Sequence, residues 1–159
     1  DAEIILTRLE EKLPKGFKLI SAENISIREK SLSQKLKSAI WSFNIKPTSG
    51  EQLSSSKWEE SIANILNAKK LIWRDNDKKG RPRERDCRPE LHSLKVQLRN
   101  IEKFEGNSDG SVQIELEALI DQMGRSLKPI QIKHWIEEYL NEPLQITNIK
   151  RDELKLLQC

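Results

Sequence analysis

Three segments of the chain alternate apolar and polar side chains with a period of two, at residues 39–45, 91–101 and 111–119. In the last of these, Val112 and Ile114 point to one side and polar residues point to the other. Successive side chains of a strand point to opposite faces, so this pattern is typical of strands that pack only one face on a core. The alternation therefore predicts a sheet made of half-buried strands.

The spacing of apolar residues and the cap signals predict how the remaining segments fold. We expect helices at residues 1–13, 31–38, 57–67 and 130–140, and further extended segments at 17–25, 69–74, 81–88 and 144–149. Turn signals at 77–80 and 106–110 join strands into hairpins. This order predicts an α+β fold with a mainly antiparallel sheet and helices on one face, in a ferredoxin-like or split βαβ arrangement.

Length and charge set further limits. The chain has 159 residues, a formal charge of +3 and 33% charged residues, which suits a single domain spanning 1–159 with a solvated surface. The stretch at 47–56, which contains Ser and Gly, is the best candidate for a subdomain boundary. No apolar run approaches the roughly 18 residues of a membrane-spanning helix. Two cysteines make no disulfide framework, so we expect a cytoplasmic protein. Because the first residue is not Met, we also expect a fragment of a longer protein.

The sequence predicts no catalytic site and no metal site in this chain. A structural zinc ion or an iron–sulfur cluster needs three or four spaced ligands. Besides the terminal Cys159, the soft ligands are Cys87, His92 and His134. Cys87 and His92 would make a weak two-point site at most, and Cys87 is better explained as a small, partly buried strand residue. No serine lies in a nucleophile elbow, and no glycine-rich phosphate loop occurs.

One segment, 74–88, has the composition of a binding site. It holds seven basic and four acidic residues, an excess equal to that of the whole chain. A hairpin of this kind can lay cationic side chains along a phosphate backbone, and Trp73 at its base can add a stacking surface. The alternative is an edge hairpin kept soluble by charge. If the hairpin binds nucleic acid, the residues that face phosphate are Lys78, Lys79, Arg81, Arg83 and Arg85.

Five short motifs follow one another along the chain in an order that resembles a known family. They are LPKGF at 13–17, SLS at 31–33, DCRP at 86–89, LKP at 127–129 and IKRDEL at 149–154. Together they resemble the radical-SAM-linked protein family, a bacterial domain of uncharacterised function that is encoded beside a radical SAM protein or fused behind one. That domain begins upstream, so the resemblance implies that residues 1–159 are the C-terminal portion of a longer protein.

The resemblance implies an accessory role. The radical SAM domain, in cis or in trans, would hold a [4Fe–4S] cluster on a CxxxCxxC motif and cleave S-adenosylmethionine, while this chain would carry no cofactor and would help to bind the substrate, with RNA as one candidate. The sequence shows no membrane segment and no pattern that points to DNA. The family-like polar and turn positions are Asp86, Arg88, Pro89, Pro129 and Arg151; each can instead serve structure, through ion pairs or helix initiation.

Two positions depart from the family pattern, and a second function stays open. The family favours an apolar residue at Cys87 and Arg at Lys128, so neither position is given a special role. The second hypothesis is a protein-interaction module that docks on its radical SAM partner through apolar surface at Trp41, Trp58 or Trp135.

Overall fold

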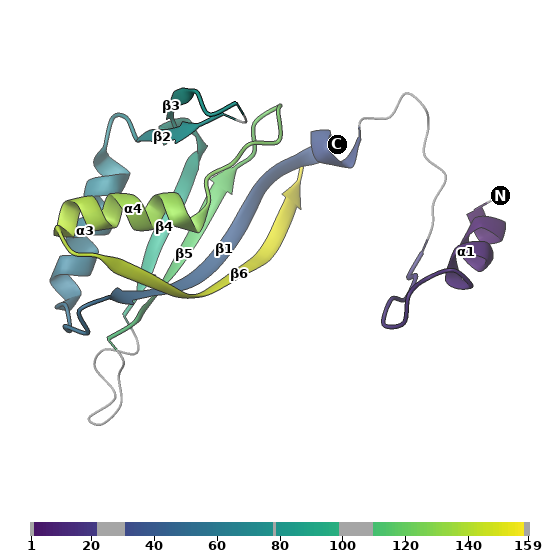
Figure 1. Ribbon diagram of the computed structural model, residues 1–159, viewed down its shortest axis with the longest axis horizontal. Helices are drawn as coiled ribbons and strands as arrows, with labels where there is room; N and C mark the ends of the chain where they lie inside the picture. Colours follow the sequence, from purple (N-terminus) through teal and green to yellow (C-terminus); the bar gives the residue numbers. More distant parts are fainter. Residues whose placement is uncertain (1, 22–30, 78, 99–109, 158–159) are drawn as a thin grey trace. The chain divides into compact units, whose positions relative to one another are not determined.

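Figure 1 shows a computed structural model of the chain, which describes residues 2–21, 31–77, 79–98 and 110–157. The chain divides into two compact units, Asp1–Ser31 and Leu32–Cys159. In the first unit, helix α1 (Ala2–Glu10) is shorter than the predicted helix over 1–13. Residues 17–21 form no strand, so that part of the predicted strand at 17–25 is wrong, and the rest of it lies outside the described residues.

The second unit contains a four-stranded antiparallel sheet with the order β4-β5-β1-β6, and a separate β2–β3 hairpin. Its elements are α2 (Leu32–Lys35), β1 (Leu36–Pro47), α3 (Ser55–Asn67), β2 (Ile72–Asn76), β3 (Pro82–Asp86), the 3₁₀ helix η1 (Arg88–Glu90), β4 (Leu91–Gln97), β5 (Val112–Leu119), α4 (Pro129–Leu140) and β6 (Leu144–Leu156). Apart from α2 and the inserted hairpin, the elements run βαββαβ, which is the split βαβ arrangement. The predicted α+β fold is confirmed.

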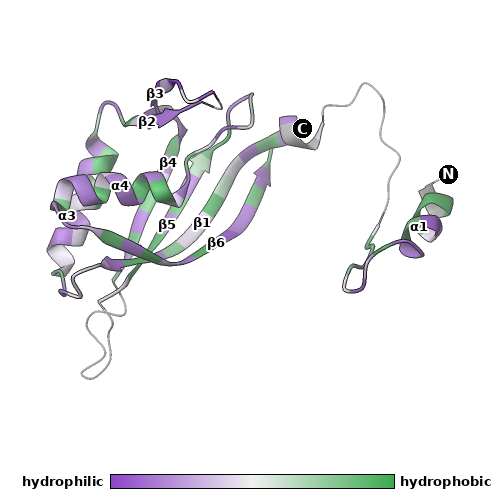
Figure 2. Cartoon of the chain, viewed as in Figure 1, coloured by the Kyte–Doolittle hydropathy of each residue, from purple (hydrophilic) through white to green (hydrophobic). Residues whose placement is uncertain are grey.

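Helices α3 and α4 lie side by side over the same face of the sheet (Figure 1). Between the two layers, Phe43 and Ile45 of β1 and Ile114 of β5 meet Trp58 of α3 and Ile132 of α4, and all five are at most 1% exposed. The strands carry alternating apolar and polar bands, as Figure 2 shows along β1. The alternation predicted from the sequence therefore separates a covered face from an open face.

Local signals explain where both large helices begin. The Ser54 hydroxyl accepts a hydrogen bond from the Lys57 N–H at 3.4 Å, so α3 starts at Ser55 rather than at the predicted residue 57. Pro129 is the first residue of α4, where its missing N–H has no cost. The Gln131 side chain also accepts from the Lys128 N–H at 2.9 Å, which completes the cap.

Two predictions fail at the end of the sheet where β1 begins. The helix expected at 31–38 stops after Lys35, because Leu36 already pairs with Leu156 of β6. Strand β6 was expected to end at 149, but it continues to Leu156 along the same partner strand. Pairing between segments distant in sequence overrides the local helical spacing in both places.

The described parts of the other predicted segments agree with the structure within a few residues. The segment 47–56 joins β1 to α3 inside the second unit. The predicted turn at 106–110 lies outside the described residues, apart from Gly110, and so does the end of the strand predicted at 91–101.

Candidate functional site

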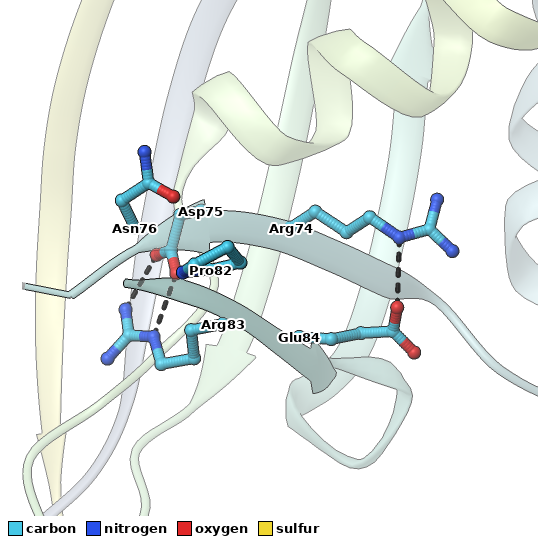
Figure 3. Close-up of a pocket in the computed structure, with 6 residues that line it drawn as sticks. All are labelled: Arg74, Asp75, Asn76, Pro82, Arg83 and Glu84. Carbon is cyan, nitrogen blue, oxygen red and sulfur yellow. Dashed lines mark hydrogen bonds and ion pairs between the residues drawn. The ribbon is translucent and has the colours of Figure 1, made fainter. Parts of the chain in front are cut away.

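Opposite charges stand across from one another in the β2–β3 hairpin. Asp75 pairs in register with Arg83, and Arg74 with Glu84. The Arg83 guanidinium donates two hydrogen bonds to the Asp75 carboxylate, at 2.8 and 2.6 Å, and Arg74 Nε lies 2.9 Å from Glu84 Oε2 (Figure 3). These side chains line a shallow depression of about 470 Å³. The charges that dominate the sequence of this segment are therefore largely neutralised by their cross-strand neighbours.

The tip of the hairpin is held by one carboxylate. Asp77 Oδ1 accepts from the N–H groups of Lys79 and Arg81, at 2.8 and 3.0 Å, and Oδ2 accepts from Arg81 Nε at 2.8 Å. The hydrogen bonds from Arg81 hold the pKa of Asp77 below its usual value. Gly80 closes the turn with φ of 75°, a conformation that glycine adopts without strain.

The base of the hairpin is anchored by a shielded ion pair. Arg85 Nη1 lies 2.5 Å from Glu90 Oε1, and their side chains are only 20% and 11% exposed. Burial raises the pKa of Glu90, although Arg85 opposes the shift. Glu90 Oε2 is buried and has no hydrogen-bond partner among the described residues. The Arg85 guanidinium is therefore held in an ion pair that is largely shielded from solvent.

The five residues predicted to face phosphate thus have different environments. Arg81 and Arg83 are exposed but each is bound to a carboxylate, Arg85 is covered, and Lys79 is exposed at the tip. Lys78 lies outside the described residues. Phosphate binding by this set stays a prediction, and the ion pairs would have to open or share their donors for it to occur.

Asp86 and Arg88, two of the family-like residues, hold the chain between α3 and β4. Asp86 Oδ1 accepts from the N–H groups of Leu71 and Arg88, both at 3.0 Å, and the bond from Arg88 contributes most to lowering the pKa of Asp86. The Arg88 guanidinium donates to the carbonyls of Leu66 and Ala68 at the end of α3, both at 3.0 Å. A cation at this position also complements the helix dipole.

The remaining family-like residues lie at three different places. Pro89 is in η1, and Pro129 opens α4. The Arg151 guanidinium carbon on β6 lies 5.7 Å from the centroid of the Trp41 ring, within the range of a cation–π contact.

The cysteine and histidines considered as ligands do not gather. Cys87 is fully buried, its Sγ lies 3.7 Å from Gln131 Nε2, and burial raises the pKa of its thiol. His92 is exposed, while His134 packs edge-on against Trp73 with centroids 5.4 Å apart. Among the described residues, no group of three or more His, Cys, Asp or Glu side chains is arranged to hold a metal ion. The described helices include none with the length and apolarity needed to cross a membrane.

Two of the three tryptophans considered as docking anchors are in the core. Trp58 is 0% and Trp135 is 7% exposed, and Trp135 Nε1 donates to the Ile72 carbonyl at 3.3 Å. Their expected role as exposed anchors is wrong, because the apolar stripes of α3 and α4 face the sheet. Trp41 is half-buried beneath Arg151.

The open face of the sheet carries a row of amide side chains that crosses all four strands. Gln97 on β4 pairs with Gln113 on β5, Gln113 with Asn44 on β1, and Asn44 with Asn148 on β6. No described residue forms a hydrogen bond with any of these four side chains. We call Gln97, Gln113, Asn44 and Asn148 the amide row. Since cross-strand partners share a face, these groups stand next to one another.

A charged row runs beside the amide row. It consists of Lys95, Glu115, Ser42 and Lys150, paired in the same strand order. Lys95 and Lys150 are exposed at the two edges of the sheet. Alternation predicted that Gln97 and Gln113 lie on the polar side of their strands, but lining them up with Asn44 and Asn148 needs the strand order and register. Sequence reasoning therefore missed this row.

The fold and these surfaces define an α+β domain in which α3 and α4 pack on one face of the sheet (Figure 1) and the other face is polar. The family described as "Uncharacterized protein conserved in bacteria (DUF2344)" matches residues 1–129, and the chain belongs to this family. Comparison with curated proteins and with solved structures found no match.

Proposed function

We propose that this chain is an accessory recognition module that binds single-stranded RNA across the open face of its sheet and presents it to a radical SAM protein. The observation that carries the RNA proposal is the amide row. Each Asn or Gln side chain offers both donors and an acceptor, which suits the hydrogen-bonding edges of unpaired bases. With neighbouring strands roughly 4.8 Å apart, the row spans about 14 Å, enough to contact more than one nucleotide.

Charge on the same surface supports this choice of partner. Lys95 and Lys150 stand at the edges of the sheet, where they can contact phosphates on either side of the bases. Lys150 Nζ also lies 2.8 Å from Asp152 Oδ1, so this cation is shared with a carboxylate. Since the paired strand positions described on the open face hold no Phe, Tyr or Trp side chain, recognition would rest mainly on hydrogen bonds rather than on base stacking.

The proposed link to radical SAM chemistry rests on the five motifs that resemble the radical-SAM-linked family. In this proposal the partner domain, in cis or in trans, supplies the [4Fe–4S] cluster and S-adenosylmethionine, and this chain positions the substrate. A second candidate, a module that docks on that partner, is favoured by a different observation. Ile149 and Leu154 on β6 are 52% and 39% exposed, and such side chains suit a protein contact.

The RNA proposal is tested by binding a labelled single-stranded RNA of mixed sequence over a range of salt concentrations. We expect the double variant Asn44→Ala/Gln113→Ala to bind at least ten-fold more weakly, with an unchanged salt dependence, because no charge is removed. Asn64→Ala is the matched control, since it removes an exposed amide from α3. Absence of binding at low salt, or equal affinity for the double variant and the control, would refute the proposal.

Two further measurements separate the remaining parts of the proposal. Reversing the charges of the hairpin residues should weaken the salt dependence if they face phosphate, and should leave it unchanged if their ion pairs are purely structural. The reversed residues are Lys78, Lys79, Arg81, Arg83 and Arg85. Co-purification with a radical SAM protein tests the partner, and failure to associate at high concentration would contradict that part alone.

A further inference from the structure

Strand β6 is an edge strand with an unusual surface. It pairs with β1 from Leu144 to Leu156, and no strand among the described residues pairs with its other edge. Ile149, Leu154 and Leu156 are 52%, 39% and 49% exposed along it. A long edge strand with unpaired backbone groups and exposed apolar side chains is a template for pairing with another strand.

The charges in the middle of β6 suggest which strand that is. The sequence at 150–153 reads Lys, Arg, Asp, Glu, two cations followed by two carboxylates. If a second β6 lies antiparallel to the first, with a two-fold axis between Arg151 and Asp152, then Lys150 stands opposite Glu153 of the second copy. This favourable pair occurs twice, once on each side of the axis.

We propose that β6 pairs antiparallel with β6 of a second copy of this chain, joining two sheets into one. The apolar residues next to the charges agree with the same axis, because Ile149 falls opposite Leu154 of the second copy. Charge complementarity and apolar complementarity thus select one register. This proposal concerns the edge of the sheet, and it stands whether or not the open face binds RNA.

A bulge in β6 makes this register possible. Between Ile40 and Trp41 the pairing with β6 shifts, so that Glu153 is opposite Ile40, Arg151 is opposite Trp41, and Asp152 is the extra residue. Successive residues of a regular strand face opposite sides of the sheet, so Lys150 and Glu153, which are three positions apart, would lie on opposite faces and could not be antiparallel partners. One extra residue at the axis removes this conflict.

The observed register confirms that the paired residues share faces. Ile149 is opposite Phe43 and Leu154 is opposite Ala39, both on the side that the helices cover. Lys150 and Glu153 are opposite Ser42 and Ile40, on the open face. Ionic contacts would therefore form on one face of the joined sheet and apolar contacts on the other. The axis is perpendicular to the sheet, so the amide rows of both copies would lie on the same side.

The competing explanation is that the charges protect the edge against strand addition, as lysines and bulges do in other edge strands. Within one chain, Lys150 already lies 2.8 Å from Asp152. A merely protective edge requires no particular order of charges. Pairing with a second copy requires cations on one side of the axis and carboxylates on the other, which is the order found in Lys150 to Glu153. This difference can be tested.

The test uses two charge variants and sedimentation velocity. The acidic variant is Lys150→Glu/Arg151→Glu, and the basic variant is Asp152→Lys/Glu153→Lys. We expect the wild-type chain to dimerise, each variant alone to be a monomer, and an equimolar mixture to form a dimer with one copy of each. Lys57→Glu on α3, a charge reversal of an exposed residue, should dimerise as the wild type does. A monomeric wild type at high concentration, or a mixture that stays monomeric, would overturn the proposal.

A second measurement guards against variants that disturb β6 itself. In a Cys159→Ser background, the double variant Ile149→Cys/Leu154→Cys places the two new thiols opposite each other across the proposed axis. Directly opposed residues of antiparallel strands are about 4.5 to 5.5 Å apart at Cα, within the range of a disulfide. Oxidation should give a covalent dimer in which both cysteine pairs are bridged. If the covalent dimer does not form while the circular dichroism spectrum matches that of the wild type, the proposed register is rejected.

Discussion

Replacing Arg88 with alanine tests whether this family-like residue serves structure or substrate. Its guanidinium donates to the carbonyls of Leu66 and Ala68 at 3.0 Å and of Leu91 at 3.3 Å. Each hydrogen bond contributes about 1 kcal/mol net, and more when the donor is charged, so the loss of three predicts a destabilisation of at least about 3 kcal/mol. The carbonyls lie at the end of α3 and the start of β4. The substitution therefore removes contacts that hold the end of α3 against the start of β4.

The measurement is the free energy of unfolding in urea for the wild type, Arg88→Ala and Arg88→Lys. We expect the lysine variant to recover only part of the loss, because an ammonium group cannot reach three carbonyls in the same planar geometry. Arg83→Ala is the control, since the exposed Arg83–Asp75 pair contributes little in water. If Arg88→Ala and Arg83→Ala unfold at the same urea concentration, the assignment of Arg88 to structure is refuted.

Three other outcomes follow from the same contacts. In a Cys159→Ser variant, the buried Cys87 thiol should react with a thiol reagent only after unfolding, and rapid reaction of the native protein would contradict its burial. Asp86→Asn should be less stable than the wild type at pH 7. Because hydrogen bonding lowers the pKa of Asp86 in the folded state, its stabilisation is present above the unfolded pKa and is lost as the pH falls through the folded pKa. The two unfolding curves should therefore begin to converge as the pH falls below about 4, and a difference that stays constant as the pH falls further would contradict this. Ile114→Ala, at the centre of the sheet and 0% exposed, should cost about 3 kcal/mol in urea unfolding, and a cost below about 1 kcal/mol would show that the core is not packed around it.

The buried faces of the strands and helices were largely predictable from local patterns. Alternation at 111–119 predicted that Val112, Ile114 and Leu116 are buried, and all three are at most 1% exposed. The helical stripes of α3 and α4 predicted that Ile62 and Ile132 face the core, as they do. Patterns of period 2 and 3.6 are properties of a single segment, so they can be read without knowing its neighbours.

The charged hairpin shows where such reasoning stops. Its composition indicated an excess of positive charge, yet Arg83 is bound to Asp75 and Arg85 to Glu90. Which acid meets which base depends on the pairing of β2 with β3 and on the position of η1. Net charge counts residues, whereas the field at a surface depends on how close the opposite charges lie.

By itself, the sequence determined the fold class, the buried faces of the main elements, and the presence of one highly charged hairpin, because these depend on residues close together in the chain. The tertiary structure decided the alignment of Gln97, Gln113, Asn44 and Asn148, the length of β6, and the bulge at Asp152. Each of these depends on strand order and register, which arise when segments separated by as many as 120 residues pair, as Leu36 and Leu156 do. Both proposed binding surfaces belong to this second group.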